Sequence, residues 1–303
     1  MWNFIFKSCK SFFFLVLVYL IFTISIVGVL DKMNIKSFIL SKNKNNEDGM
    51  IYILGNSHPE CAINDSLLPT NFANIAQSAE PLFYSVIKAR KLLNNCKIDT
   101  IVIEFTNNSL NTVKWAMSDS SLMRNYKKHF AAMSIEEHAF LFNNNPKKFL
   151  KTFFSMSPTQ IFSSQKNIEG GYLFLIRNKI KGNEKPFILN ATIKNRSFDQ
   201  IKKNEIVGFA NLLSLIKGHP TTFFVITRMP MHTSYEGLEN EIQFQNCIKQ
   251  LNKNKNCRFI DFLKSNLNDT DFGDAEHLNH YGARKFTPVF RDSVRSISSQ
   301  KKF

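Results

Sequence analysis

Short apolar segments alternate with amphipathic ones from Met50 onward, and this alternation constrains the fold more than any other feature. Met50 to Leu54 is a continuous apolar run ended by Gly55, which is typical of a strand buried on both faces. Residues 80–95 place apolar side chains three and four positions apart, which predicts an amphipathic helix, and residues 101–103 predict a second buried strand. Strand, helix and strand in this order predict a right-handed βαβ unit with parallel strands.

The same rhythm returns in the carboxyl-terminal half of the chain. It predicts helices at 197–218, 238–251 and 279–297 and strands at 221–230 and 257–262. Pro288 falls inside the last of these helices, where we expect a break or a kink. The predicted fold class is therefore α/β, a three-layer α/β/α sandwich around a mainly parallel sheet.

The stretch from about 111 to 196 does not follow this rhythm. Ser134 to Glu137 form a capping-box pattern, and the phenylalanine-rich segments after it predict helices inserted between two strands of the sheet. Such an insertion can be a lid, a partner surface or additional core. Its phenylalanines favour additional core.

An uncharged apolar run occupies residues 11–30. As a helix it is about 30 Å long, the thickness of a bilayer core, and it predicts a transmembrane anchor. A cleavable signal peptide is the alternative, but the run exceeds the usual ~7–15 residues and no A-x-A-like site follows. The predicted organisation is a cytoplasmic segment at 1–10, the anchor at 11–30, a polar linker at 31–49 and one domain at 50–303. Lysines flank the run on both sides, so charge does not fix its orientation.

The composition narrows the classes of partner. The net charge is +15, but the lysines are scattered among asparagines rather than gathered on one arm or helix, which disfavours a nucleic-acid partner. The five cysteines form no C-x-x-C pair. Cys247 and Cys257 can bridge a helix to a strand, but two unpaired buried thiols are the favoured interpretation.

Candidate catalytic residues follow the predicted strands. Ser57 comes just after the first strand, and Asp274 and His277 lie three residues apart near the carboxyl end. The carboxyl ends of parallel strands share one edge of a sheet, where ligands bind. A serine hydroxyl needs an adjacent base, and that base needs a partner that fixes its tautomer. We therefore expect Ser57 as nucleophile, His277 as general base and Asp274 as the residue that orients it.

An acyl-transfer site also needs donors for the developing oxyanion. The candidates are the backbone N–H groups of Ser57 and Ala79 and the side-chain amide of Asn108. Arg228 and His58 are candidates for substrate binding. A metal site built from Asp274, His277, His280 and His58 is the rival interpretation, but no firm fourth ligand is visible, so neither a metal nor a cofactor is predicted.

Four short motifs carry a resemblance to a known family. They are "GNSH" at 55–58, "NIAQSA" ending at Ala79, "EFTNNSL" at 104–110 and "DAEH" at 274–277. In this order they resemble the four blocks of the SGNH, or GDSL-like, hydrolase superfamily, which implies a flavodoxin-like architecture and places Ser57, Ala79, Asn108 and the Asp274/His277 pair in its site. Asn56 replaces the usual aspartate of the first block, and Ala79 stands where the family usually has glycine. Thr106 replaces another glycine, which makes Asn107 an alternative donor to Asn108.

The resemblance and the anchor together predict a function. "GNSH" is also similar to the "GDSH" opening of SGNH domains found with membrane acyltransferases. We expect a single-pass protein of the cytoplasmic membrane with its domain outside, an O-acyl esterase or O-acyltransferase of surface polysaccharide. One span cannot carry an acyl donor across the membrane. If the protein is a transferase, we therefore expect a multispanning membrane O-acyltransferase as its partner. The alternative is a catalytically silent scaffold or glycan-binding component.

Overall fold

The computed structural model describes residues 14, 18, 49–95, 97–110, 119–156, 170–176, 203–235 and 240–299. Within these ranges, five parallel strands form one sheet in the order β2-β1-β3-β4-β5. The strands are β1 (Ile51–Leu54), β2 (Phe72–Asn74), β3 (Thr100–Glu104), β4 (Phe223–Arg228) and β5 (Cys257–Asp261). The predicted α/β class with a parallel sheet is confirmed. Strand β2 was not predicted, because three residues carry no readable periodicity.

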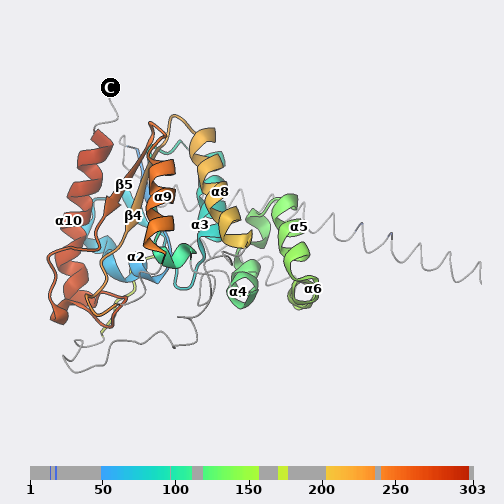
Figure 1. Cartoon of the computed structure of the whole chain (residues 1–303), viewed down its shortest axis with the longest axis horizontal. Coiled ribbons are helices and arrows are strands. Elements are labelled where there is room, and N and C mark those ends of the chain that lie inside the picture. Colours follow the sequence, from blue (N-terminus) through green and yellow to red (C-terminus); the bar gives the residue numbers. More distant parts are fainter. Residues whose placement is uncertain are drawn as a thin grey trace, which may run out of the picture.

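Helices cover both faces of the sheet (Figure 1). On one face lie α3 (Leu82–Asn95), α8 (Lys203–Gly218) and α9 (Glu241–Leu251), and on the other lie α2 (Ser57–Ala62) and α10 (His280–Ser299). Tyr52 of β1 packs into the first core and its neighbours Ile51 and Ile53 pack into the second, as alternation along a strand requires. Of the break or kink expected at Pro288, the break is absent, because α10 runs through this residue as one helix.

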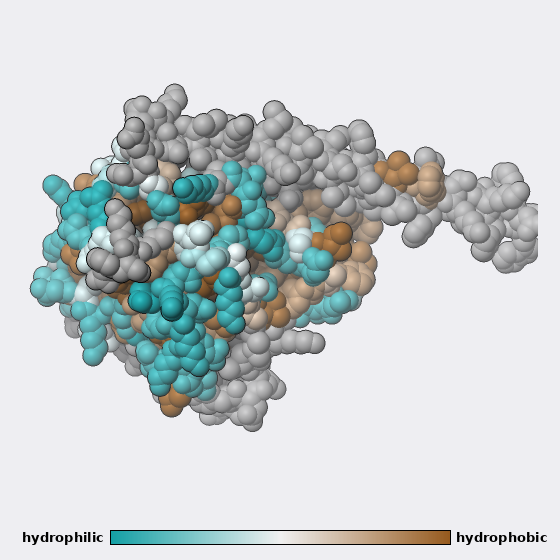
Figure 2. Space-filling model, turned by 90° about the horizontal axis from the view of Figure 1, so that it is seen from above, coloured by the Kyte–Doolittle hydropathy of each residue, from teal (hydrophilic) through white to brown (hydrophobic). Residues whose placement is uncertain are grey.

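The insertion is mainly helical from 119 to 156, whereas its described residues 170–176 form no helix or strand. It contains α4 (Asp119–His129), α5 (Ile135–Asn144) and α6 (Pro146–Phe154), which lie beside the sandwich (Figure 1). α4 and α5 contact α3, and α6 packs on α4 and α5. Both halves of the predicted capping box at Ser134 and Glu137 are present. Leu122 and Tyr126 are fully buried against α3, so the insertion adds a third core. Figure 2 shows hydrophobic side chains also on the surface toward α5 and α6, where Ile135 and Phe154 are exposed.

Short 3-10 turns lie between these elements: η1 (Asp65–Leu67), η2 (Asn107–Leu110), η3 (Phe130–Ala132) and η7 (Asp269–Asp271). Cys247 and Cys257 are free thiols, as the favoured interpretation predicted. In the described ranges, no helix combines the length and apolar character that a membrane span requires. The predicted anchor at 11–30 lies outside these ranges except for Phe14 and Val18, and so do the segments 1–10 and 31–48.

Candidate active site

The turn after β1 places Ser57 at the first position of α2. Gly55 has φ +152°, and a Cβ there would lie 2.7 Å from both the Glu104 Cβ and the Pro59 Cγ, so only glycine fits. Asn56 caps the helix, because its side chain accepts a hydrogen bond from the His58 N–H at 2.8 Å. This close turn presents the Ser57 hydroxyl to the cavity beyond the sheet.

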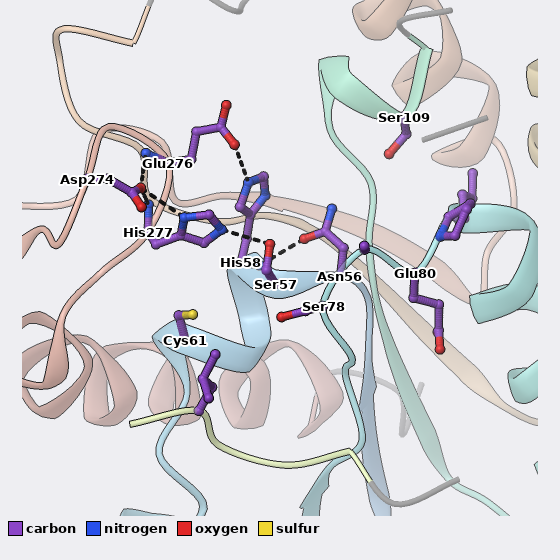
Figure 3. A pocket seen from close by; sticks show the side chains of 14 residues that line it. Asn56, Ser57, His58, Cys61, Ser78, Glu80, Ser109, Asp274, Glu276 and His277 are labelled. Carbon is purple, nitrogen blue, oxygen red and sulfur yellow. Dashed lines mark hydrogen bonds and ion pairs between the residues drawn. The ribbon is translucent and has the colours of Figure 1, made fainter. Parts of the chain in front are cut away.

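The structure brings Ser57, His277 and Asp274 into one hydrogen-bonded chain, although Ser57 and His277 are 220 residues apart (Figure 3). The His277 Nε2 lies 2.7 Å from the Ser57 Oγ, and the His277 Nδ1 lies 2.8 Å from the Asp274 Oδ1. The same carboxylate oxygen accepts the backbone N–H groups of Glu276 and His277, each at 2.9 Å. The nucleophile, base and orienting group predicted from the sequence therefore have the required geometry.

The environment of Asp274 keeps it ionised. Burial raises the pKa of this carboxyl, but the hydrogen bonds from His277 and from the backbone outweigh burial and lower it below its ordinary value. The carboxylate accepts a hydrogen bond from the Nδ1–H of His277. The Nε2 of the neutral ring then carries a lone pair, which faces Ser57. His277 is thus held in the tautomer that can accept the serine proton.

A cavity of about 370 Å³ opens above these residues (Figure 3). Its apolar wall includes Cys61, Pro81, Leu82 and Leu173. Ala79 also lines the cavity. The polar residues of the lining are Asn56, Ser57, His58, Ser78, Glu80, Ser109, Asp274, Glu276 and His277. This volume and mixed lining suit a small ligand with an apolar part and several polar groups.

Ala79 lies in the left-handed region, with φ +58°. This conformation explains why glycine suits the position, since a side chain there costs about 1 kcal/mol or more. The turn is anchored beside the nucleophile, because the Gln77 N–H donates to the Gly55 carbonyl at 3.0 Å. Within the described part of the chain, the N–H groups of Ser57 and Ala79 have no protein acceptor. Both remain available as oxyanion donors.

Buried polar groups hold this turn from behind. The Asn125 side chain of α4 donates to the Ala79 carbonyl at 2.8 Å. Lys88 of α3 donates to the Ile75 carbonyl and pairs with Glu80, each at 2.8 Å. His129 of α4 approaches the same Glu80 oxygen at 3.4 Å. The insertion therefore contributes directly to the geometry of the site.

Replacing Asn125 by alanine is expected to lower kcat about 10- to 100-fold and to leave KM nearly unchanged, because a misplaced Ala79 N–H weakens only transition-state binding. Asn125→Asp, which keeps the size but loses the donor, should behave alike. Arg124→Ala on the exposed side of α4 is the control. Steady-state kinetics on an aryl acetate ester measure the effect, and an unchanged kcat in both Asn125 variants would refute this role.

Glu80 gives the fold a pH dependence. Burial would raise its pKa, but Lys88 and the contact with His129 lower it to about 2, from an ordinary value of 4.5. Between these pH values the unfolded chain binds more protons than the folded chain, so stability is lost as the pH falls. Glu80→Gln is expected to cost about 3–5 kcal/mol at pH 7, because Lys88 is left buried without its partner.

This cost should shrink as the pH approaches 2, where wild-type Glu80 is also protonated. Denaturant titrations of the full-length protein at several pH values measure the difference, with the exposed Asp292→Asn as the control. A difference that stays constant with pH would argue against the ionised pair.

Two predicted positions need correction. The Asn107 amide donates to Glu241 at 2.7 Å and its carbonyl accepts from Arg228 at 2.9 Å, so this side chain is engaged away from Ser57. Arg228 is buried and also binds Asp261 and Glu241. Neither residue is among those that line the described cavity. Arg228 therefore ties the ends of β4 and β5 together instead of facing the cleft.

The remaining predicted positions are placed as follows. Asn108 lies in η2, and its side chain is outside the described structure, so its role as a donor stays a prediction. His58 lines the cavity, and its role in substrate binding stays a prediction. His280 stacks on Phe174 with ring centroids 4.7 Å apart, and this contact separates it from the rival metal set.

Sequence reasoning missed the partners of His58. The His58 Nδ1 lies 2.6 Å from the Glu104 Oε1, and its Nε2 lies 3.9 Å from the Glu276 Oε2. Burial would lower the pKa of His58, but these two carboxylates raise it to about 10. Glu104 also accepts the Asn56 N–H at 3.1 Å. Its position at the end of a buried strand was a readable signal, whereas nothing marked Glu276 apart from its place beside His277.

Comparisons with known proteins add little to this geometry. No protein-family model and no curated protein sequence matches the chain. A crystal structure from Bacteroides fragilis NCTC 9343, described as "a putative acylhydrolase", is similar with a TM-score of 0.42 and 11% identity, over 84% of this chain and 90% of that one. At this distance the likeness carries no argument about activity, and the functional proposal rests on the site.

Proposed function

We propose that this protein is a serine-dependent O-acyl esterase or O-acyltransferase of the SGNH type. The observation that carries the proposal is the chain from Ser57 through His277 to Asp274, with hydrogen bonds of 2.7 and 2.8 Å, at the edge of a cavity. The N–H groups of Ser57 and Ala79 also support it, because both residues line the cavity and neither N–H has an acceptor in the described part of the chain.

The first half of the proposed reaction acylates Ser57. The Ser57 Oγ attacks the acyl carbonyl carbon while the His277 Nε2 takes the hydroxyl proton. Negative charge develops on the carbonyl oxygen, where the N–H groups of Ser57 and Ala79 stabilise it. His277 then returns its proton to the leaving alkoxide, the ester C–O bond breaks, and the acyl group remains on Ser57.

In the second half, a hydroxyl group attacks the acyl-serine and loses its proton to His277. The bond between the acyl carbon and the Ser57 Oγ then breaks, and His277 returns the proton to the Ser57 oxygen. Water as acceptor completes hydrolysis, and a sugar hydroxyl completes transfer. Which acceptor reacts depends on how well the site binds the sugar and excludes water. The cavity volume of about 370 Å³ suits a short acyl group such as acetyl together with part of the acceptor.

The cellular location and the substrate of the enzyme are part of the same proposal. We infer a single-pass protein of the cytoplasmic membrane, with its domain in the periplasm or outside the cell, that acts on surface polysaccharide. The uncharged run at 11–30 supports the anchor, and the scattered positive charge suits an anionic envelope. A transferase would receive its acyl group through a multispanning membrane partner.

Two experiments test these parts. Purified full-length protein is given an aryl acetate ester with and without envelope polysaccharide, and acetate release is compared with acetate bound to the glycan. Hydrolysis that is insensitive to the glycan, with no glycan product, would remove the transferase. A carboxyl-terminal reporter that is active only in the cytoplasm would overturn the external placement.

A further inference from the structure

Two imidazole rings converge at the mouth of the cavity. The ring centroids of His58 and His277 lie 5.3 Å apart, and in both rings the Nδ1 is held by a carboxylate, at 2.6 Å from Glu104 and 2.8 Å from Asp274. The other ring nitrogen, Nε2, lies 3.9 Å from the Glu276 Oε2 in His58 and 2.7 Å from the Ser57 Oγ in His277. A carboxylate on the far ring nitrogen is the arrangement that typically orients and strengthens a metal-binding histidine.

A third ligand completes the set. The Glu276 carboxylate lies with the two histidines so that one ligand atom from each residue falls within 4.8 Å of the others (Figure 3). All three residues line the cavity, which gives an ion a path of entry. Two imidazoles and one carboxylate form a ligand set that Zn²⁺ takes with a fourth position left open. Bonds of about 2.0–2.2 Å in tetrahedral geometry place ligand atoms roughly 3.3–3.6 Å apart, so these side chains would have to approach one another by at most about 1.5 Å.

The local charge also favours a dication. Three carboxyl groups, those of Glu104, Asp274 and Glu276, contact these two rings within 4 Å. A dication bound at the rings would offset the repulsion among these acidic groups.

We propose that His58, Glu276 and His277 form an inhibitory zinc site superimposed on the catalytic centre. The bound ion would occupy the His277 Nε2, the atom that must accept the Ser57 proton, and so block acylation. The inhibitory effect rests on the proposed function, whereas binding of the metal does not. The ligand set differs from the one considered from the sequence, since Asp274 supports a ligand and His280 lies elsewhere.

Binding is tested first, without reference to activity. Full-length protein is stripped with a chelator and titrated with Zn²⁺ by calorimetry and with Co²⁺ by visible absorption. We expect one equivalent to bind and the intense bands of low-coordinate cobalt to appear. Glu276→Gln and His58→Gln should each weaken binding at least 10- to 100-fold. Asp269 pairs with His232 outside the proposed site. Asp269→Asn, which removes this carboxylate, should leave zinc affinity unchanged.

Inhibition is tested second, by the rate at which a fluorophosphonate labels Ser57. Zinc should slow labelling of the wild-type protein, and Glu276→Gln should require at least 10-fold more zinc for the same effect. Equal zinc affinity in wild type and both variants would overturn the site. Zinc binding without any labelling of the stripped protein would leave the metal site standing and contradict the proposed function instead.

Discussion

Replacing Ser57 by alanine is expected to lower kcat for ester cleavage by about 10⁴- to 10⁶-fold. The nucleophile is lost, while the oxyanion donors and the cavity stay and sustain only a small residual rate. Within the described ranges, the Ser57 hydroxyl has a hydrogen bond to His277 and no other, and the His277 side chain is itself 20% exposed. The fold should therefore tolerate the change, and the melting temperature should stay within a few degrees.

The measurement is steady-state hydrolysis of an aryl acetate ester by full-length protein. Ser66→Ala, which changes an exposed serine on η1, is the matched control and should retain wild-type activity. A Ser57→Ala variant that keeps more than about a tenth of the wild-type kcat would exclude Ser57 as the nucleophile. It would also favour the silent-scaffold interpretation if the wild-type rate were itself near background.

Removal of the Asp274 carboxylate is the second large effect. Asp274→Ala is expected to lower kcat by about 10⁴-fold, because His277 loses the group that fixes its tautomer and stabilises its charged form. Asp274→Asn should lower kcat less than Asp274→Ala. The Asp274 Oδ1 also accepts two backbone N–H groups at 2.9 Å, which would keep an asparagine oxygen directed at the His277 Nδ1.

The order of the two variants is therefore informative. kcat and KM are measured for both, with Asp269→Asn as the control for loss of a carboxylate elsewhere on the same loop. Equal losses in Asp274→Ala and Asp274→Asn would mean that the backbone N–H groups do not hold the side chain in place. Near-wild-type activity in both would remove Asp274 from the catalytic set.

The architecture was readable because its signals are local and repeated. Strands β1 and β3 are continuous apolar runs, and α3 has a clear apolar stripe, so the βαβ unit follows from periodicity. Strand β2 was not predicted, because it is only three residues long and its strand conformation depends on pairing with β1. α10 continues through Pro288, and Phe286 and Phe290 on either side of the proline are buried in the core between α10 and the sheet. Such tertiary packing can outweigh the local preference of a proline, and the sequence of the helix alone does not reveal it.

The candidate catalytic residues could be predicted for a different reason. Ser57, Asp274 and His277 belong to motifs whose order and chemistry limit their roles. The supporting residues have no such signature: Asn125 and Lys88 matter because tertiary packing brings them against the turn at Ala79. Arg228 shows the reverse error, since a cation after a strand looked available for substrate until its partners were placed.

Fluorophosphonate labelling of the full-length protein, followed by peptide mass spectrometry, tests the catalytic assignment most directly. The probe reacts only with a serine whose hydroxyl is activated by a neighbouring base. The geometry predicts one adduct, on Ser57, which is formed by the wild-type protein and lost in His277→Ala. Folded wild-type protein that carries no adduct on Ser57, or an adduct that forms there equally fast without His277, would contradict it.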